Sequence, residues 1–224
     1  MVLAACGEPM ATPEAVFLQA SGSMALAPLV ADLAAAYSEG APTVSLDVTG
    51  LGTRDGLDAL RAGKGVLALA SWLSPAPLGE DVSGLGLEPE WTATAIARDG
   101  IAVIVHPDNP VDGLGLLQLR DLFSGRAVDW QALSDGRSSG TVQPVSREKG
   151  SGTRAAFESQ VMEDLPVTPR SVVVPSSRAV VEYVADHPQA IGYVSLALVP
   201  SGQVASGVKV LEIEGILPTL ESAG

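Results

Sequence analysis

The sequence alternates between short apolar runs and longer amphipathic stretches, and this alternation constrains its fold more than any other feature. Strand-sized runs are followed by stretches in which apolar residues recur at helical spacing, as Leu26, Leu29 and Leu33 do. Strands and helices that alternate in this way form an open, mainly parallel sheet with helices on its faces. The sequence therefore predicts an α/β fold.

The expected elements fall into two groups along the chain. The first group has strands at 16–20, 44–48 and 66–70, with helices at 25–37 and near 57–61. The second group has strands at 92–97, 101–105, 142–146, 172–174 and 191–194, with helices at 116–123, 155–161 and 178–186. Two groups in 224 residues predict two lobes, the first made of residues 15–92 and 196–224 and the second of residues 93–195. Crossing strands near Ala95 and Ile191 are expected to form the hinge between them.

Each strand of the first group ends near a small hydroxyl residue at the start of a helix or loop. These residues are Ser23, Thr53 and Ser71. The carboxyl ends of parallel strands meet at one edge of a sheet, where ligands of open α/β folds bind. We therefore expect the three side chains to face a common ligand.

The segment 146–154 is the strongest candidate for a binding site. Its Gly-Ser-Gly-Thr turn opens a helix, which directs free backbone N–H groups and the positive end of the helix dipole outward. Ser151 and Thr153 add hydroxyl donors, and Arg147 adds a planar guanidinium group whose paired N–H donors suit oxyanions. The alternative is an ordinary helix N-cap in which the glycines ease the turn. The spacing of Arg147, together with the hydroxyl residues at the strand ends, favours an anion site.

The charge of the chain is acidic, with 26 Asp and Glu against 13 Lys and Arg. This net charge of −13 excludes nucleic acid, whose partners need a basic surface. It would also repel an anion at long range, so an anion site must be local and built from backbone amides and a few guanidinium groups. No apolar run reaches the roughly 18 residues of a membrane-spanning helix.

Cys6 is the single cysteine, so an internal disulfide is excluded. Residues 3–7, LAACG, resemble the bacterial lipoprotein cleavage box, in which lipid is attached to the cysteine and Ala5 is the small residue before it. Five residues precede Cys6, so this copy lacks the apolar signal core and would not be processed as written. We expect residues 1–14 to be a lipobox remnant and linker; a buried or frayed cysteine is the alternative.

The sequence contains no recognisable catalytic or metal-binding pattern. His106 and His187 have no partners at the spacing of a metal site or a catalytic triad, and there is no Ser-His-Asp set, P-loop or zinc pattern. We therefore expect a protein that is not an enzyme and that has no metal and no cofactor. Glu148 and Lys149 are expected to be solvated.

Four stretches resemble a known family, and they occur in that family's order. They are residues 97–110 (ARDGIAVIVHPDNP), 119–125 (LRDLFSG) with Trp130, 146–154 (SREKGSGTR) and 190–195 (AIGYVS). The chain resembles the phosphate-binding proteins of phosphate ABC transporters, within the type II periplasmic-binding-protein family, from about Phe17 to Thr219. The resemblance implies two lobes, each an open and mainly parallel sheet flanked by helices. Because the family usually continues after residue 219, either this copy is truncated or its first lobe is minimal.

The resemblance also implies a phosphate site assembled from both lobes. With Ser71 at its strand end, the candidate residues are Ser23, Met24 through its backbone N–H, Thr53, Ser71, Arg147, Ser151, Gly152 and Thr153. The implied function is that of an extracytoplasmic substrate-binding protein of an ABC importer. It would capture phosphate or a related oxyanion by lobe closure and deliver it to a permease. We expect a monomer that contacts the membrane only through a lipid on Cys6.

One departure from the family affects selectivity. Trp72 stands where phosphate binders carry an Asp or, in other members, an Arg that helps to select the anion. A carboxylate accepts the proton of a protonated oxyanion and disfavours sulfate, whereas an indole only donates. Selectivity could be weaker, moved to Asp55, or aimed at another ligand, or Trp72 could simply pack. Two other readings stay open: a ligand-sensing receptor or scaffold with lost or altered anion specificity, and a phosphatase-like enzyme.

Overall fold

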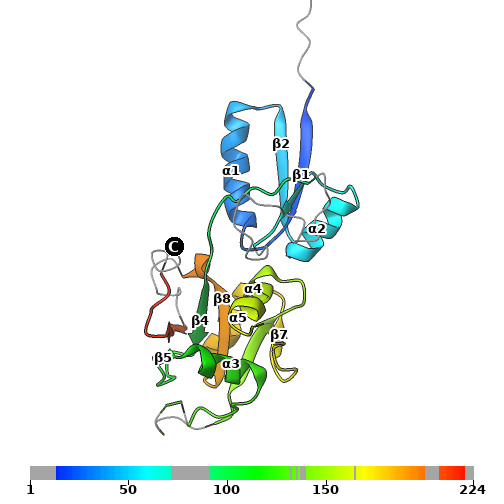
Figure 1. Cartoon of the computed structure of the whole chain (residues 1–224). Coiled ribbons are helices and arrows are strands. Elements are labelled where there is room, and N and C mark those ends of the chain that lie inside the picture. Colours follow the sequence, from blue (N-terminus) through cyan, green and yellow to red (C-terminus); the bar gives the residue numbers. More distant parts are fainter. Residues whose placement is uncertain are drawn as a thin grey trace, which may run out of the picture.

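The protein is described from a computed structural model, which covers residues 14–71, 91–131, 133–134, 136, 140–163, 165–199 and 207–219. The described chain forms two lobes, and residues 91–100 run between them without regular secondary structure (Figure 1). Both lobes combine helices with a sheet, so the predicted α/β fold is confirmed. The predictions for Cys6 and Trp72 concern residues outside the described ranges.

Lobe 1 contains a three-stranded parallel sheet with the strand order β2-β1-β3. Its elements are β1 (Val16–Gly22), α1 (Ala27–Gly40), β2 (Val44–Gly50), α2 (Thr53–Arg61) and β3 (Leu67–Leu69). The helix α1 packs against β2, and α2 packs against β1 and β3. Because β1 and β2 pair in register from Val16–Val44 to Gly22–Gly50, both strands end at the same level. These carboxyl ends point towards lobe 2 (Figure 1).

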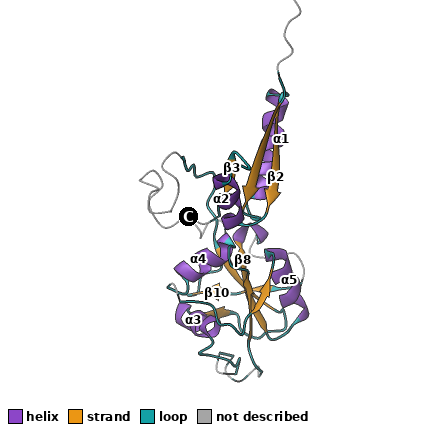
Figure 2. Cartoon of the chain, turned by 90° about the vertical axis from the view of Figure 1, so that its right-hand side faces the viewer, coloured by secondary structure: helices purple, strands orange, loops and turns teal. Residues whose placement is uncertain are grey.

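Lobe 2 contains a five-stranded mixed sheet with the strand order β7-β6-β8-β4-β9. Its elements are β4 (Ile101–Val105), β5 (Gly113–Leu114), α3 (Leu116–Ser124), β6 (Gln143–Arg147), α4 (Gly152–Gln160), β7 (Val172–Val174), α5 (Ser177–Asp186), β8 (Ala190–Ser195), a 3₁₀ turn (Leu196–Leu198), β9 (Lys209–Val210) and β10 (Glu212–Ile213). The strands β6, β7 and β8 are parallel, whereas β4 is antiparallel to both of its neighbours, β8 and β9. Figure 2 shows this lobe turned by a quarter, with α3 and α4 on one side of the sheet and α5 on the other.

The sheet of lobe 2 is buried on both faces because apolar residues occupy consecutive positions of its central strands. In β4, Val103 and Val105 belong to the cluster that contains Phe123 and Phe157, while Ile104 faces the cluster around α5. Successive side chains of a strand point to opposite faces, so an unbroken apolar run supplies both clusters. Lobe 2 therefore has the larger core of the two lobes, and this core supports the residues at the ends of its strands.

The structure differs from the sequence-based prediction in the segments expected to join the lobes. Residues 92–97 were predicted as a strand but have no regular structure, and Ile191 lies inside β8 in the sheet of lobe 2, so no crossing strand runs there. Residues 196–224 were expected to return to the first lobe. Instead, β9 pairs with β4 and β10 pairs with β5.

Two contacts explain why the segment 209–214 stays with lobe 2. The side chain of Leu211 is fully buried in the lobe 2 core. The Glu214 carboxylate accepts a hydrogen bond from the Leu116 backbone N–H at 2.6 Å, which caps the first turn of α3 with an acceptor of favourable charge. The two-residue strands β9 and β10 are too short to show a periodic pattern in the sequence.

Among the helices of the described ranges, none combines the length and the apolar character needed to cross a bilayer.

Candidate functional site

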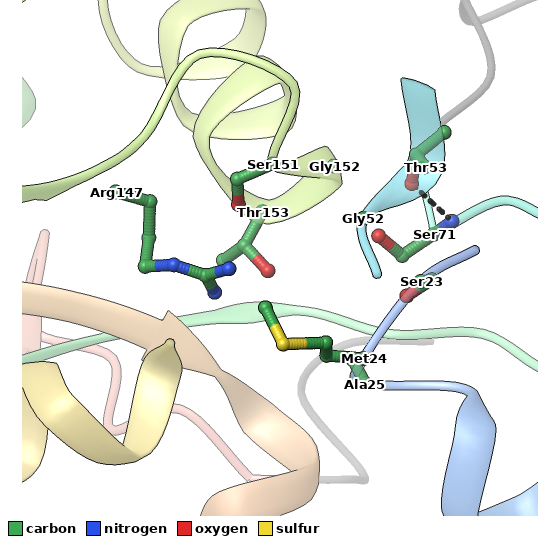
Figure 3. Close-up of a pocket in the computed structure, with 10 residues that line it drawn as sticks. All are labelled: Ser23, Met24, Ala25, Gly52, Thr53, Ser71, Arg147, Ser151, Gly152 and Thr153. Carbon is green, nitrogen blue, oxygen red and sulfur yellow. Dashed lines mark hydrogen bonds between the residues drawn. The ribbon is translucent and has the colours of Figure 1, made fainter. Parts of the chain in front are cut away.

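A small cavity lies between the two lobes and collects all the residues that the sequence proposed for the site (Figure 3). The space open to a water-sized sphere is about 10 Å³, which is far below the range of roughly 300–1,000 Å³ for drug-sized ligands. The residues that line it are Ser23, Met24, Ala25, Gly52, Thr53 and Ser71 from lobe 1 and Arg147, Ser151, Gly152 and Thr153 from lobe 2. The cavity therefore fits a small ion better than a large organic molecule.

Three helix N-termini meet at this cavity. The helices are α1, α2 and α4, and each begins at or just after a residue of the lining. The first N–H groups of a helix have no partner within the helix, and the helix dipole places about half a positive charge at this end. The three termini therefore direct backbone donors and partial positive charge at one point, although the chain as a whole is acidic.

Three hydroxyl groups of the lining accept local hydrogen bonds. Ser23 Oγ accepts from the Leu26 N–H at 3.3 Å, and Ser151 Oγ accepts from the Arg154 N–H at 3.3 Å as the N-cap of α4. Thr53 Oγ1 likewise accepts from the backbone N–H of the neighbouring Ser71 at 3.3 Å, a bond drawn in Figure 3. Each oxygen already accepts a backbone hydrogen, so its own hydrogen remains available to donate to an anion.

Arg147 ends β6 and is buried, with 3% of its surface exposed. Its Nε and Nη2 donate to the two oxygens of Glu148 at 2.9 and 2.8 Å, and its Nη1 donates to Ser177 Oγ at 2.9 Å. A longer bond of 3.4 Å reaches the Pro175 carbonyl. These bonds use four of the five N–H donors of the guanidinium, so one donor remains for a ligand in the cavity. Glu148 was predicted to be solvated; instead it holds Arg147 with two bonds and offsets its charge.

A buried polar pair supports the strand end that carries Arg147. The Tyr193 hydroxyl lies 2.7 Å from Ser146 Oγ and accepts a hydrogen bond of 3.5 Å from the Arg147 backbone N–H. The Tyr193 ring stacks on Phe157 of α4 with 4.0 Å between the centroids. Burial raises the pKa of Tyr193, and the hydrogen bonds with Ser146 and Arg147 oppose this effect only in part. Tyr193 thus connects the end of β6 to the helix whose N-terminus lines the cavity.

The lining contains donors and hydroxyls but no carboxylate from the described ranges. Asp55, to which selectivity could have moved, lies in the first turn of α2, is exposed and does not line the cavity. The described residues also include no group of three or more His, Cys, Asp or Glu placed to hold a metal ion. The arrangement can therefore bind an anion through hydrogen bonds, without an acceptor carboxylate among these residues.

Comparison with known proteins identifies the family. The model of the PBP superfamily domain matches residues 9–222, which is nearly the whole chain. The chain belongs to the PBP superfamily. Among curated relatives of this PBP chain, the phosphate-binding protein PstS of Bacillus subtilis is 27% identical over 201 residues, which cover 90% of this chain and 63% of the relative. The PBP chain thus spans less than two thirds of that relative's length.

Two crystal structures show the same two-lobed type II periplasmic-binding-protein fold. One, from Clostridium perfringens, is described as a phosphate ABC transporter substrate-binding protein with bound phosphate. It is 30% identical to this chain, with a TM-score of 0.72, and the match covers 89% of this chain and 76% of the Clostridium perfringens chain. The other, an ABC-type phosphate transport receptor from Vibrio cholerae, is 27% identical with a TM-score of 0.70, and the match covers 92% of this chain and 80% of the receptor. The resemblance found in the sequence is confirmed.

The sequence missed three participants in the site of this PBP chain. Ala25 and Gly52 line the cavity, and each is the direct neighbour of a residue that was predicted. Alanine and glycine carry no polar side chain, so residue type gave no signal. Glu148 was missed because a charged residue in a turn is usually solvated, and only the side-chain geometry brings it to Arg147.

Proposed function

We propose that this protein is the extracytoplasmic substrate-binding component of an ABC importer and that it captures inorganic phosphate, or a related oxyanion, between its two lobes. One observation carries the proposal: three helix N-termini, several buried hydroxyls and one guanidinium surround a single small cavity. A dianion that leaves water must exchange its hydration shell for many convergent donors, and the lining supplies donors from both lobes. The names of the relatives from Bacillus subtilis and Clostridium perfringens support phosphate as the ligand.

The mechanism we propose is capture by lobe closure, with no chemistry on the ligand. Residues 91–100 would act as the hinge segment, because they connect the lobes without pairing in either sheet. An anion held first by one lobe would then gain donors from the other as the cleft closes, which makes the closed state the tighter one. Opening at a membrane permease would release the anion. A lipid on Cys6 would tether the protein outside the cytoplasm near that permease.

Calorimetric titration with phosphate, arsenate, sulfate and molybdate tests this function, with a phosphatase assay on the same sample. We expect binding of phosphate without hydrolysis of a phosphate ester. Phosphate should also stabilise the folded state, by about 2.7 kcal/mol at a hundredfold excess over the dissociation constant, since the ligand binds only the folded chain. If none of the four anions binds or shifts the melting temperature, the importer function is wrong, and a receptor or scaffold without anion binding becomes the better interpretation.

A further inference from the structure

The turn 150–152 of lobe 2 contacts the N-terminus of α2 in lobe 1. The Arg54 backbone N–H donates across the cleft to the Gly150 carbonyl at 3.4 Å. A Cβ placed on Gly150 would lie 3.5 Å from the Cβ of Arg54, and one placed on Gly52 would lie 3.6 Å from the Gly150 carbonyl oxygen. Three glycines, Gly52, Gly150 and Gly152, therefore lie where the lobes touch.

Gly152 has the least space of the three. A Cβ at this position would overlap the Ser71 hydroxyl, would lie 2.5 Å from Thr53 Oγ1 and would lie 3.3 Å from the Ser71 Cβ. All of these atoms belong to lobe 1, whereas Gly152 is the first residue of α4 in lobe 2. By contrast, a Cβ on the similarly crowded Gly56 would meet backbone of its own lobe, at Ser21 and Gly22.

The backbone conformation does not require glycine at this position. Gly152 is absent from the glycines that adopt a positive φ, although its neighbour Gly150 has a φ of 106°. Where glycine adopts an ordinary backbone conformation, alanine would usually stabilise the protein because it has less conformational freedom to lose on folding. A glycine that its backbone does not require is explained by the space that the other lobe occupies.

We propose that Gly152 sets how far the two lobes close. Because it has no side chain, Thr53 and Ser71 can rest against the first turn of α4, and this approach places donors from both lobes within reach of one small anion. A methyl group at residue 152 would meet these two side chains and hold the cleft partly open. This inference rests on the proposed function, because closure matters only if an anion is captured.

The test compares the wild type with Gly152→Ala and with Gly40→Ala as a matched control. Gly40 is the last residue of α1, and a Cβ there would meet nothing within 4 Å. Phosphate affinity is measured by calorimetry, and lobe closure by small-angle scattering with and without phosphate. We expect Gly152→Ala to bind phosphate at least about tenfold more weakly and to compact less, since overpacking of this kind forces a backbone shift. Gly40→Ala should behave as the wild type does.

Thermal unfolding separates closure from a folding defect. Alanine has less conformational freedom to lose on folding, so Gly152→Ala should unfold at the same temperature as the wild type or slightly higher while it binds less well. Adding Ser71→Ala to Gly152→Ala removes the overlapping hydroxyl and should restore part of the compaction. Wild-type binding and compaction in Gly152→Ala would overturn the inference, as would weaker binding with unchanged compaction. If the wild type itself binds no phosphate, the proposed function fails, and the inference fails with it.

Discussion

Replacing Arg147 by alanine removes the guanidinium that lines the cavity, and the size of the effect follows from its surroundings. The side chain is 3% exposed, so its bond to an anion would be charge-assisted and shielded from water, which is typically about 1.5–3 kcal/mol. A second cost comes from Glu148, whose side chain is 34% exposed and whose negative charge would lose its partner close to the cavity. Together we expect a loss of about 2–5 kcal/mol, or roughly 30-fold to several thousandfold in phosphate affinity.

The two contributions can be separated by calorimetric titration of a second variant. Arg147→Ala/Glu148→Gln lacks the unpaired carboxylate, so it should bind phosphate more tightly than Arg147→Ala alone, though less tightly than the wild type. Circular dichroism and thermal unfolding check that both variants remain folded. If Arg147→Ala changes the affinity less than about threefold, Arg147 does not contact the ligand. If the double variant binds no better than the single one, Glu148 has no electrostatic effect on the site.

Three further predictions address selectivity, screening and pH. Trp72→Asp should sharpen the preference for phosphate over sulfate, because a carboxylate accepts the proton of phosphate and repels sulfate. An unchanged ratio of the two affinities would assign Trp72 to packing. A tenfold rise in ionic strength should change the phosphate dissociation constant only a few-fold, since buried contacts are screened little; a much steeper dependence would indicate a surface site. Burial raises the pKa of Tyr193, so the unfolded chain loses this proton first and stability should fall as the pH rises above about 10. Urea unfolding at about pH 8 and 10.5 should show a smaller fall in Tyr193→Phe, and an equal fall in both proteins would contradict the reasoning.

The elements that could be predicted from the sequence are those whose pattern is local. The periodic stretch that became α1 and the apolar runs of β4 and β8 each carry enough residues to show a helical or strand signal. The segment 92–97 carries a strand-like pattern but finds no neighbouring strand to pair with. The pairing of β9 and β10 depends on partners about a hundred residues away, and two-residue strands carry no period of their own.

Part of the candidate site could be predicted because parallel strands bring the residues that follow them to one edge of the sheet. Ser23, Thr53 and Ser71 follow strands of one parallel sheet, and the sheet geometry brings their positions to one edge without knowledge of tertiary contacts. The bonds between Arg147 and Glu148 require a particular choice of side-chain rotamers, which a sequence does not contain. The crowding at Gly152 requires knowledge of how closely the lobes approach each other.

The acidic charge of this chain is compatible with the proposed anion site because the two act over different distances. At physiological ionic strength, the field of exposed carboxylates decays over about 8 Å, whereas the donors of the cavity act in direct contact with a ligand. The bonds between Arg147 and Glu148 offset the one formal positive charge among the described residues of the lining, so helix dipoles and hydroxyl groups would supply much of the attraction. Such donors lie on both lobes, and separating the lobes removes about half of them at once. A site of this kind would hold an anion firmly when it is closed and release it when it opens, as the proposed transfer to a permease requires.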